Sequence, residues 1–87
     1  MIKIVDFYAT WCGPCKVLSK TLEEIKELPD VTIEKVDIED NPELTEQYKV
    51  RSVPTLVFFK NNEMKATTVG AISKEKLMSI IDKLKEE

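Results

Sequence analysis

Two cysteines, Cys12 and Cys15, are the residues of this chain best suited to chemistry. They lie three positions apart in the segment Trp-Cys-Gly-Pro-Cys, which also holds the only tryptophan and one of the two glycines. Residues 2–9, before it, are rich in β-branched and aromatic side chains, and residues 15–28, after it, have helical spacing and no glycine or proline. We therefore expect the segment to lie where a strand ends and a helix begins.

A thiol at that position would be activated. The first turn of a helix has N–H groups without intrahelical partners, and it carries the positive end of the helix dipole. Both features stabilise a thiolate, so the pKa of a cysteine there falls below its free value of about 8.5. The thiolate is also the form that attacks a disulfide.

The cysteine pair has three possible roles. A structural disulfide over so short a loop would constrain little of the unfolded chain. A structural zinc site needs four ligands, and the chain has no histidine and no other cysteine, so such a site would require a second chain. The remaining interpretation is a redox pair, which fits a Cys-x-x-Cys motif near a βαβ pattern.

Length and composition narrow the possible functions. With 87 residues the chain is expected to form one domain, residues 1–87. Hydrophobic residues at 43% and charged residues at 33% are typical of a soluble globular protein. The net charge of −3, without a basic stripe, argues against a nucleic-acid-binding protein. No signal peptide and no apolar run of membrane-spanning length stand out, which predicts a cytoplasmic protein without a membrane segment.

The hydrophobic pattern predicts seven elements in the order β-α-β-α-β-β-α. They are expected at residues 2–9, 15–28, 31–38, 42–48, 56–59 and 64–69, with a final helix after Ser73. Asn41 and Ser73 are the expected N-caps of the last two helices, and residues 60–63 form a hairpin turn. The first strand–helix–strand unit implies a parallel pair, so we predict an α/β three-layer sandwich: a mixed four-stranded sheet with helices on both faces.

One carboxylate interrupts the apolar first strand. Asp6 either lies where water reaches it, or it is buried with a raised pKa and handles protons. The sequence alone favours neither alternative. Lys35, in the second strand, is by itself most often a solvated lysine.

Several motifs in order resemble the thioredoxin family. They are Val5-Asp6-Phe7-Tyr8-Ala9, Trp11-Cys12-Gly13-Pro14-Cys15-Lys16, Asp37, Asn41-Pro42, Val53-Pro54-Thr55 and Val69-Gly70-Ala71. Cys-x-x-Cys alone is weak evidence, whereas the combination across nearly the whole chain is specific. The chain is similar to a short member, because the strand and helix that usually precede the first strand are missing. Lys20, Ser52 and Asn62 stand where many members have proline, glycine and glycine, respectively.

The resemblance implies a role for each catalytic residue. Cys12, nearer to solvent, would attack, and Cys15, one helical turn deeper, would resolve the mixed disulfide. Asp6 would lie beneath Cys15 and accept its proton through water, with Lys35 beside it as a charge partner. Gly13 and Pro14 would let the chain turn tightly into the helix.

The resemblance also implies a substrate surface. Val53-Pro54 would be a cis peptide facing the cysteines, which exposes the backbone of Val53 to an extended substrate strand. An apolar collar around Cys12 would comprise Trp11, Pro14, Val53, Pro54, Gly70 and Ala71. The alternatives are a strand-start proline at Pro54 and ordinary core packing for Trp11.

The implied function is that of a protein dithiol-disulfide oxidoreductase. It would reduce disulfides in protein substrates as a monomer without cofactor or metal, and a thioredoxin reductase would recharge it. One alternative is a glutaredoxin-like enzyme that uses glutathione, which the short length suits but the Trp-Cys-Gly-Pro-Cys motif does not. Another is a non-enzymatic, rigid subunit of a larger complex.

Overall fold

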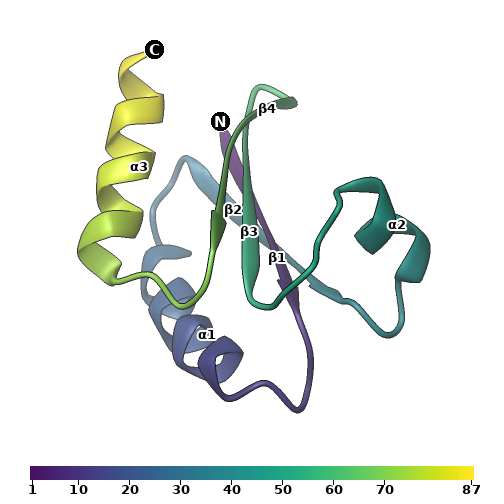
Figure 1. Ribbon diagram of the computed structural model, residues 1–87. Helices are drawn as coiled ribbons and strands as arrows, with labels where there is room; N and C mark the ends of the chain where they lie inside the picture. Colours follow the sequence, from purple (N-terminus) through teal and green to yellow (C-terminus); the bar gives the residue numbers. More distant parts are fainter.

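The computed structural model describes residues 1–87 and contains a four-stranded sheet with helices on both faces (Figure 1). The strands follow the order β2-β1-β3-β4 across the sheet. β1 is parallel to β2 and antiparallel to β3, and β4 is antiparallel to β3. In chain order the elements are β1 (Ile2–Tyr8), α1 (Gly13–Ile25), β2 (Val31–Asp37), α2 (Pro42–Gln47), β3 (Thr55–Lys60), β4 (Glu63–Val69) and α3 (Lys74–Glu86). The predicted element order and mixed sheet are confirmed.

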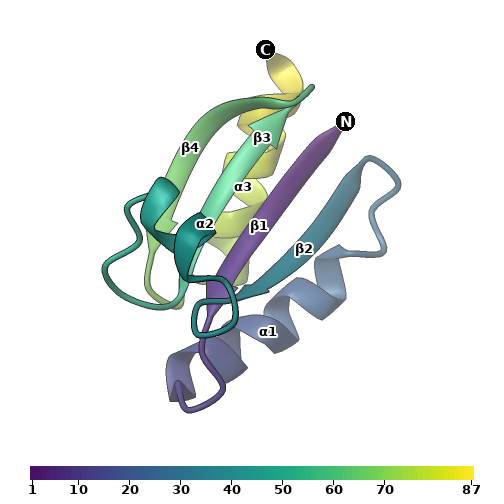
Figure 2. The same ribbon diagram turned by 90° about the vertical axis from the view of Figure 1, so that its right-hand side faces the viewer.

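One face of the sheet is covered by α1 and α3, which lie on the side away from α2 (Figures 1 and 2). Alternate residues of β1 point toward these helices, because successive side chains of a strand face opposite sides. Ile2 and Ile4 are among them, and they pack against the apolar stripes of both helices. The resulting core has eleven buried residues: Ile2, Ile4, Leu18, Leu22, Ile25, Val31, Leu56, Phe58, Leu77, Ile81 and Leu84.

The other face is covered by the short helix α2 (Figure 2). Its buried cluster has four members, Val5, Phe7, Val36 and Val57. Tyr48, just after α2, packs its ring 5.7 Å from that of Phe7. This face therefore has a smaller core, and α2 itself contributes no buried residue to it.

The bounds of α1 differ from the prediction. The helix ends at Ile25, whereas the sequence predicted that it would continue to Leu28. The N–H of Leu28 instead donates to the carbonyl of Ile25 in a tighter turn, because Pro29 disfavours the helical conformation of the residue before it. The helix also begins earlier, at Gly13, because the side chain of Cys12 caps it.

One of the two predicted side-chain caps is confirmed. The hydroxyl of Ser73 accepts a hydrogen bond from the N–H of Lys76 at 3.1 Å. Asn41 lies at the N-cap position of α2, but its side chain makes no capping bond. Its amide donates to the carbonyl of Asp37 at 3.0 Å and so holds the preceding turn. None of the three helices combines the length and the apolar character needed to cross a membrane.

Candidate active site

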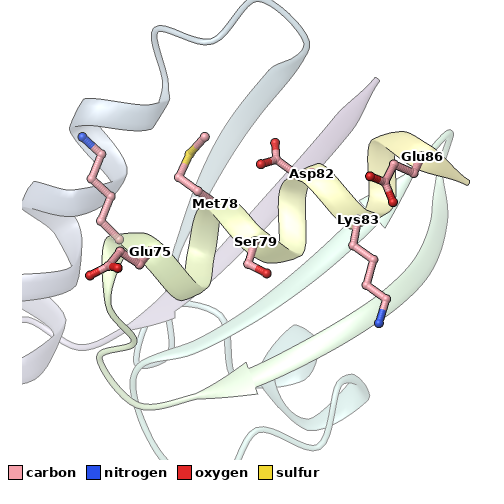
Figure 3. A pocket seen from close by; sticks show the side chains of 7 residues that line it. Glu75, Met78, Ser79, Asp82, Lys83 and Glu86 are labelled. Atoms are coloured by element: carbon pink, nitrogen blue, oxygen red, sulfur yellow. The ribbon is translucent and has the colours of Figure 1, made fainter.

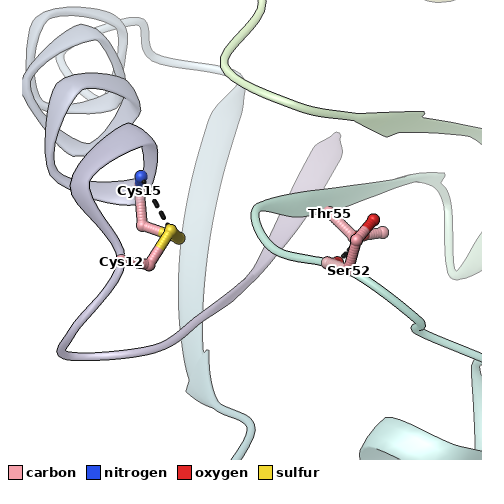
Figure 4. The surroundings of a disulfide bond; sticks show 4 residues. All are labelled: Cys12, Cys15, Ser52 and Thr55. Atoms are coloured by element: carbon pink, nitrogen blue, oxygen red, sulfur yellow. Dashed lines mark hydrogen bonds between the residues drawn. A yellow bond between two sulfur atoms is a disulfide. The ribbon is translucent and has the colours of Figure 1, made fainter.

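The two cysteines lie at the start of α1, as the sequence predicted, and they form a disulfide with Cα atoms 5.3 Å apart (Figure 4). Cys12 is the N-cap residue, and Cys15 lies in the first turn. The sulfur of Cys12 accepts a hydrogen bond from the N–H of Cys15 at 3.1 Å. An otherwise unpaired N–H of the helix terminus is thus directed at this sulfur.

The two cysteines are equally buried. Cys12 is 4% exposed and Cys15 is 3% exposed, so the disulfide form does not distinguish the two cysteines by solvent access, and the expectation that Cys12 lies nearer to solvent stays a prediction. The reason for their equal burial is local packing: the cysteines and Ala9 form a small buried cluster. Tyr8, Ile38 and Val53 pack against this cluster. Tyr8 and Ile38 were not predicted as part of the site, because only the fold brings them to it.

The loop before β3 approaches the disulfide. The Val53–Pro54 peptide bond is cis, as the resemblance implied. The N–H of Gly70 donates to the carbonyl of Pro54 at 2.8 Å, which joins the ends of β3 and β4. The hydroxyl of Thr55 donates to the carbonyl of Ser52 at 2.7 Å and holds the turn that precedes the strand (Figure 4). Two predicted substrate-binding segments are therefore hydrogen-bonded to each other.

Most other residues of the predicted substrate surface are accessible, whereas the side chain of Pro54 is buried and does not contribute to an exposed collar. The side chain of Trp11 is 66% exposed, which excludes core packing as its role. Gly13, Pro14 and Ala71 are exposed, and Gly70 is half-buried. Gly70 has a φ of 94°, a conformation that favours glycine. An exposed indole thus stands directly beside the buried disulfide in the sequence.

Asp6 is buried in the middle of the sheet, with a side chain that is 1% exposed. Neither carboxyl oxygen has a hydrogen-bond partner. Loss of hydration raises the pKa of Asp6 to about 6, although the charge of Lys35 opposes the shift. The burial and the raised pKa of the second alternative are confirmed, and the role of Asp6 in handling protons stays a prediction.

Asp6 and Cys15 belong to the same side of the sheet. Asp6 follows Ile4 on the face of β1 that packs against α1 and α3. Cys15 begins the buried stripe of α1, which continues with Leu18 and Leu22 and packs on this same face. The carboxyl and the second thiol are therefore both directed into the layer between β1 and α1.

Lys35 is the cross-strand partner of Asp6 in the register of β1 and β2. Its ammonium does not pair with the carboxylate. It donates to the hydroxyl of Ser19 at 2.9 Å and lies 4.8 Å from the centre of the Tyr8 ring. The predicted charge partner is thus on the correct face, but it acts on Asp6 over a distance, because Ser19 and Tyr8 hold it at the surface.

Two hollows on the surface have different characters. The largest, about 640 Å³, follows the exposed side of α3 and has no cysteine in its lining (Figure 3). A second, of about 430 Å³, lies beside the disulfide and includes Cys15, Lys16, Lys20 and Lys35 in its lining. No three histidine, cysteine or acidic side chains lie close enough together to hold a metal ion. The hollow beside Cys15 was not predicted, because it needs α1 and β2 to be placed together.

Comparison with known families gives one consistent result. The family model for Thioredoxin matches residues 1–83. Thioredoxin of Chlamydia trachomatis is 48% identical over 81 residues, which is 92% of this chain and 79% of that protein. Thioredoxin of Rickettsia typhi is 49% identical over 82 residues, 92% of this chain and 78% of that protein.

Solved structures agree with the sequence comparison. A mutant thioredoxin from Halobacterium salinarum superposes with a TM-score of 0.90 at 38% identity, and the match covers 94% of this chain and 73% of that one. The germline-specific thioredoxin Deadhead from Drosophila melanogaster gives a TM-score of 0.87 at 41% identity, covering 95% and 80% of the two chains. The predicted fold is confirmed, and the glutathione-dependent alternative finds no support among these relatives.

Proposed function

The chain belongs to the thioredoxin family and is a protein dithiol-disulfide oxidoreductase, and we propose that Cys12 is its attacking sulfur and Cys15 its resolving sulfur. The observation that carries this assignment is the hydrogen bond from the N–H of Cys15 to the sulfur of Cys12. In the reduced protein the same N–H would stabilise a thiolate on Cys12, and the positive end of the α1 dipole would add to it.

The reaction transfers two electrons from the dithiol to a substrate disulfide. The thiolate of Cys12 attacks one substrate sulfur, a Cys12–substrate bond forms, and the other substrate sulfur leaves as a thiolate that takes up a proton. Cys15 then loses its proton and attacks Cys12, which releases the second substrate thiol. The products are the Cys12–Cys15 disulfide and two substrate thiols, so atoms and electrons balance.

Asp6 is proposed as the group that receives the proton of Cys15, through a water molecule. Its pKa of about 6 supports this role, because a base is most effective when its pKa lies near the working pH. Its burial on the face that packs against α1 supports it further. Lys35, through its charge on that face, would keep the pKa from rising more.

The proposed substrate surface consists of Trp11, Gly13, Pro14, Val53, Pro54, Gly70 and Ala71. Its support is the exposure of Trp11 and the packing of Val53 against the cysteine cluster. An extended segment of the partner would pair with the backbone of Val53. An apolar surface of this kind suits many partners, because its contacts depend little on the partner's amino-acid sequence.

The partners and the setting are proposed at the same level. We expect a thioredoxin reductase to recharge the disulfide, and proteins with accessible disulfides to be the substrates. A dithiol reductant requires a reducing compartment, which favours the cytoplasm. We further propose that residues 1–87 form one domain and that it acts as a monomer. The family match over residues 1–83 and the continuous core support the single domain.

A trapping experiment tests the order of the two sulfurs. With Cys15→Ser, attack by Cys12 can occur but resolution cannot, so a stable mixed disulfide with a substrate such as insulin should accumulate. The matched variant Cys12→Ser keeps the other thiol and should trap little or none. Mass spectrometry of the non-reduced products measures both. Accumulation on Cys12→Ser in place of Cys15→Ser would reverse the assignment.

A further inference from the structure

We propose that the hollow beside Cys15 docks an acidic segment of the disulfide-bearing partner, so that carboxylates near a disulfide mark a preferred substrate. We call it the lysine hollow and define it by Cys15, Lys16, Ser19, Lys20 and Lys35. The inference rests on the proposed function, because the docked segment is part of the molecule that Cys12 attacks.

The lysine hollow carries three positive charges and no carboxylate in its lining, in a chain whose net charge is −3. No carboxylate lies within 4.0 Å of any of the three ammonium groups, because the ion pairs of the chain involve other lysines. The two acidic residues of α1 closest in sequence after Lys20 are already engaged: Glu23 pairs with Lys26, and Glu24 pairs with Lys74.

The geometry of the three lysines favours an anion. Lys16 and Lys20 are one helical turn apart on α1, where like charges repel each other and destabilise the helix by a few tenths of a kcal/mol. The ammonium of Lys35 is held between the hydroxyl of Ser19 and the ring of Tyr8. A negatively charged segment would relieve the repulsion and would meet one charge that is already positioned.

The location of the lysine hollow ties it to the reaction. Cys15 contributes to its lining, so a group bound there lies beside the disulfide. Trp11 and Val53 do not line it, which separates it from the proposed apolar surface. Three separated charges around an open hollow of about 430 Å³ suit several carboxylates on one segment better than one small anion.

Peptide substrates can test the preference. Three disulfide-bonded peptides of identical core would carry three glutamates, three glutamines or three lysines next to the disulfide. Second-order rate constants for reduction by the dithiol form of the protein are measured by rapid quench and chromatography of the released thiols. At low salt we expect the glutamate peptide to react about tenfold faster than the glutamine peptide, a modest steering effect. At about 1 M salt, where the Debye length is near 3 Å, the difference should vanish.

Two charge reversals localise the effect. Lys20→Glu and the control Lys83→Glu each replace +1 by −1 on an exposed helix position, which takes the net charge from −3 to −5 in both variants. Lys20→Glu should reduce the glutamate-to-glutamine rate ratio at least about threefold. Lys83→Glu, on α3 and outside the lysine hollow, should keep it. Circular dichroism checks that each variant is folded, and Lys20→Gln offers a milder change at the same position.

The outcomes separate the two proposals. If no peptide is reduced, the proposed function itself fails. If all three are reduced at one rate, or the lysine peptide is fastest, the docking site is wrong while the oxidoreductase stands. If the glutamate-to-glutamine rate ratio fell equally in Lys20→Glu and Lys83→Glu, the preference would come from the overall charge, and the docking site would also be wrong.

Discussion

The two faces of the sheet differ both in packing and in chemistry. The face under α1 and α3 has a core of eleven buried residues, whereas the face under α2 has four. The first face also holds the buried carboxyl of Asp6 and the inward-facing Cys15. On the second face, Lys3 pairs with Glu34 at 3.2 Å at the surface of the sheet, and its ammonium lies 5.8 Å from the centre of the Phe59 ring.

This difference shows where the site obtains its support. A disulfide at the end of a helix needs that helix to be fixed, and the apolar stripe of α1 does so through the larger core. The same core excludes water from Asp6, which raises its pKa. Stability and chemistry are therefore coupled on one face and much less on the other.

The largest expected effect is on the free energy of unfolding, when one side chain on each face of the sheet is truncated in turn. Ile81 is fully buried on α3, so Ile81→Ala should lower the free energy of unfolding by about 2–5 kcal/mol. Leu44 on α2 is only half-buried, and Leu44→Ala should cost about 1 kcal/mol. Urea unfolding of both variants measures the difference. Equal losses would show that the two faces contribute alike, which would break the comparison.

Substitution of Asp6 is expected to have a smaller effect on the free energy of unfolding, and one of opposite sign. Its pKa rises from an ordinary 3.8 to about 6, so the folded state binds more protons than the unfolded state between these values. Stability therefore falls as pH rises from about 4 to about 6, by at most about 3 kcal/mol. Asp6→Asn removes this pH-dependent loss of stability. We therefore expect the variant to be more stable than the parent protein by about 1–3 kcal/mol at pH 7–8, and to show no such gain below about pH 4.

The same substitution should slow the reaction. A positioned general base contributes about 10²–10⁴-fold, and because water can replace Asp6 in part, we expect a loss of about 10- to 100-fold in insulin reduction. The control Asp82→Asn changes an exposed carboxylate on α3 and should shift stability by less than about 0.5 kcal/mol. If Asp6→Asn were less stable at pH 8 and fully active, the burial and the proton role would both be contradicted.

Most of the fold could be predicted from the sequence, because its signals are local. Helical spacing marked α1 and α3, and the asparagines of the hairpin turn, Asn61 and Asn62, have φ values of 51° and 68° in the structure. The end of α1 was misplaced because Leu28 continues the apolar stripe. Leu28 packs against the core, but its backbone is no longer part of the helix.

The site was predicted less completely, because parts of it depend on distant contacts. The cluster that contains Cys12 is covered in part by Val53, which the loop before β3 brings to it. The position of the Lys35 ammonium depends on Ser19 across the gap between β2 and α1. The lysine hollow has one signal in the sequence, the spacing of Lys16 and Lys20. The third charge, that of Lys35, lies near them only in the folded chain.

The central claim is that the N-terminus of α1 stabilises a thiolate on Cys12. Its most direct test is the rate of iodoacetamide alkylation of the reduced protein as a function of pH, with the modified cysteine identified by mass spectrometry. The account predicts that Cys12 reacts before Cys15 and that its rate rises with a midpoint clearly below the free-cysteine pKa of about 8.5. A midpoint at or above 8.5, or earlier modification of Cys15, would contradict it.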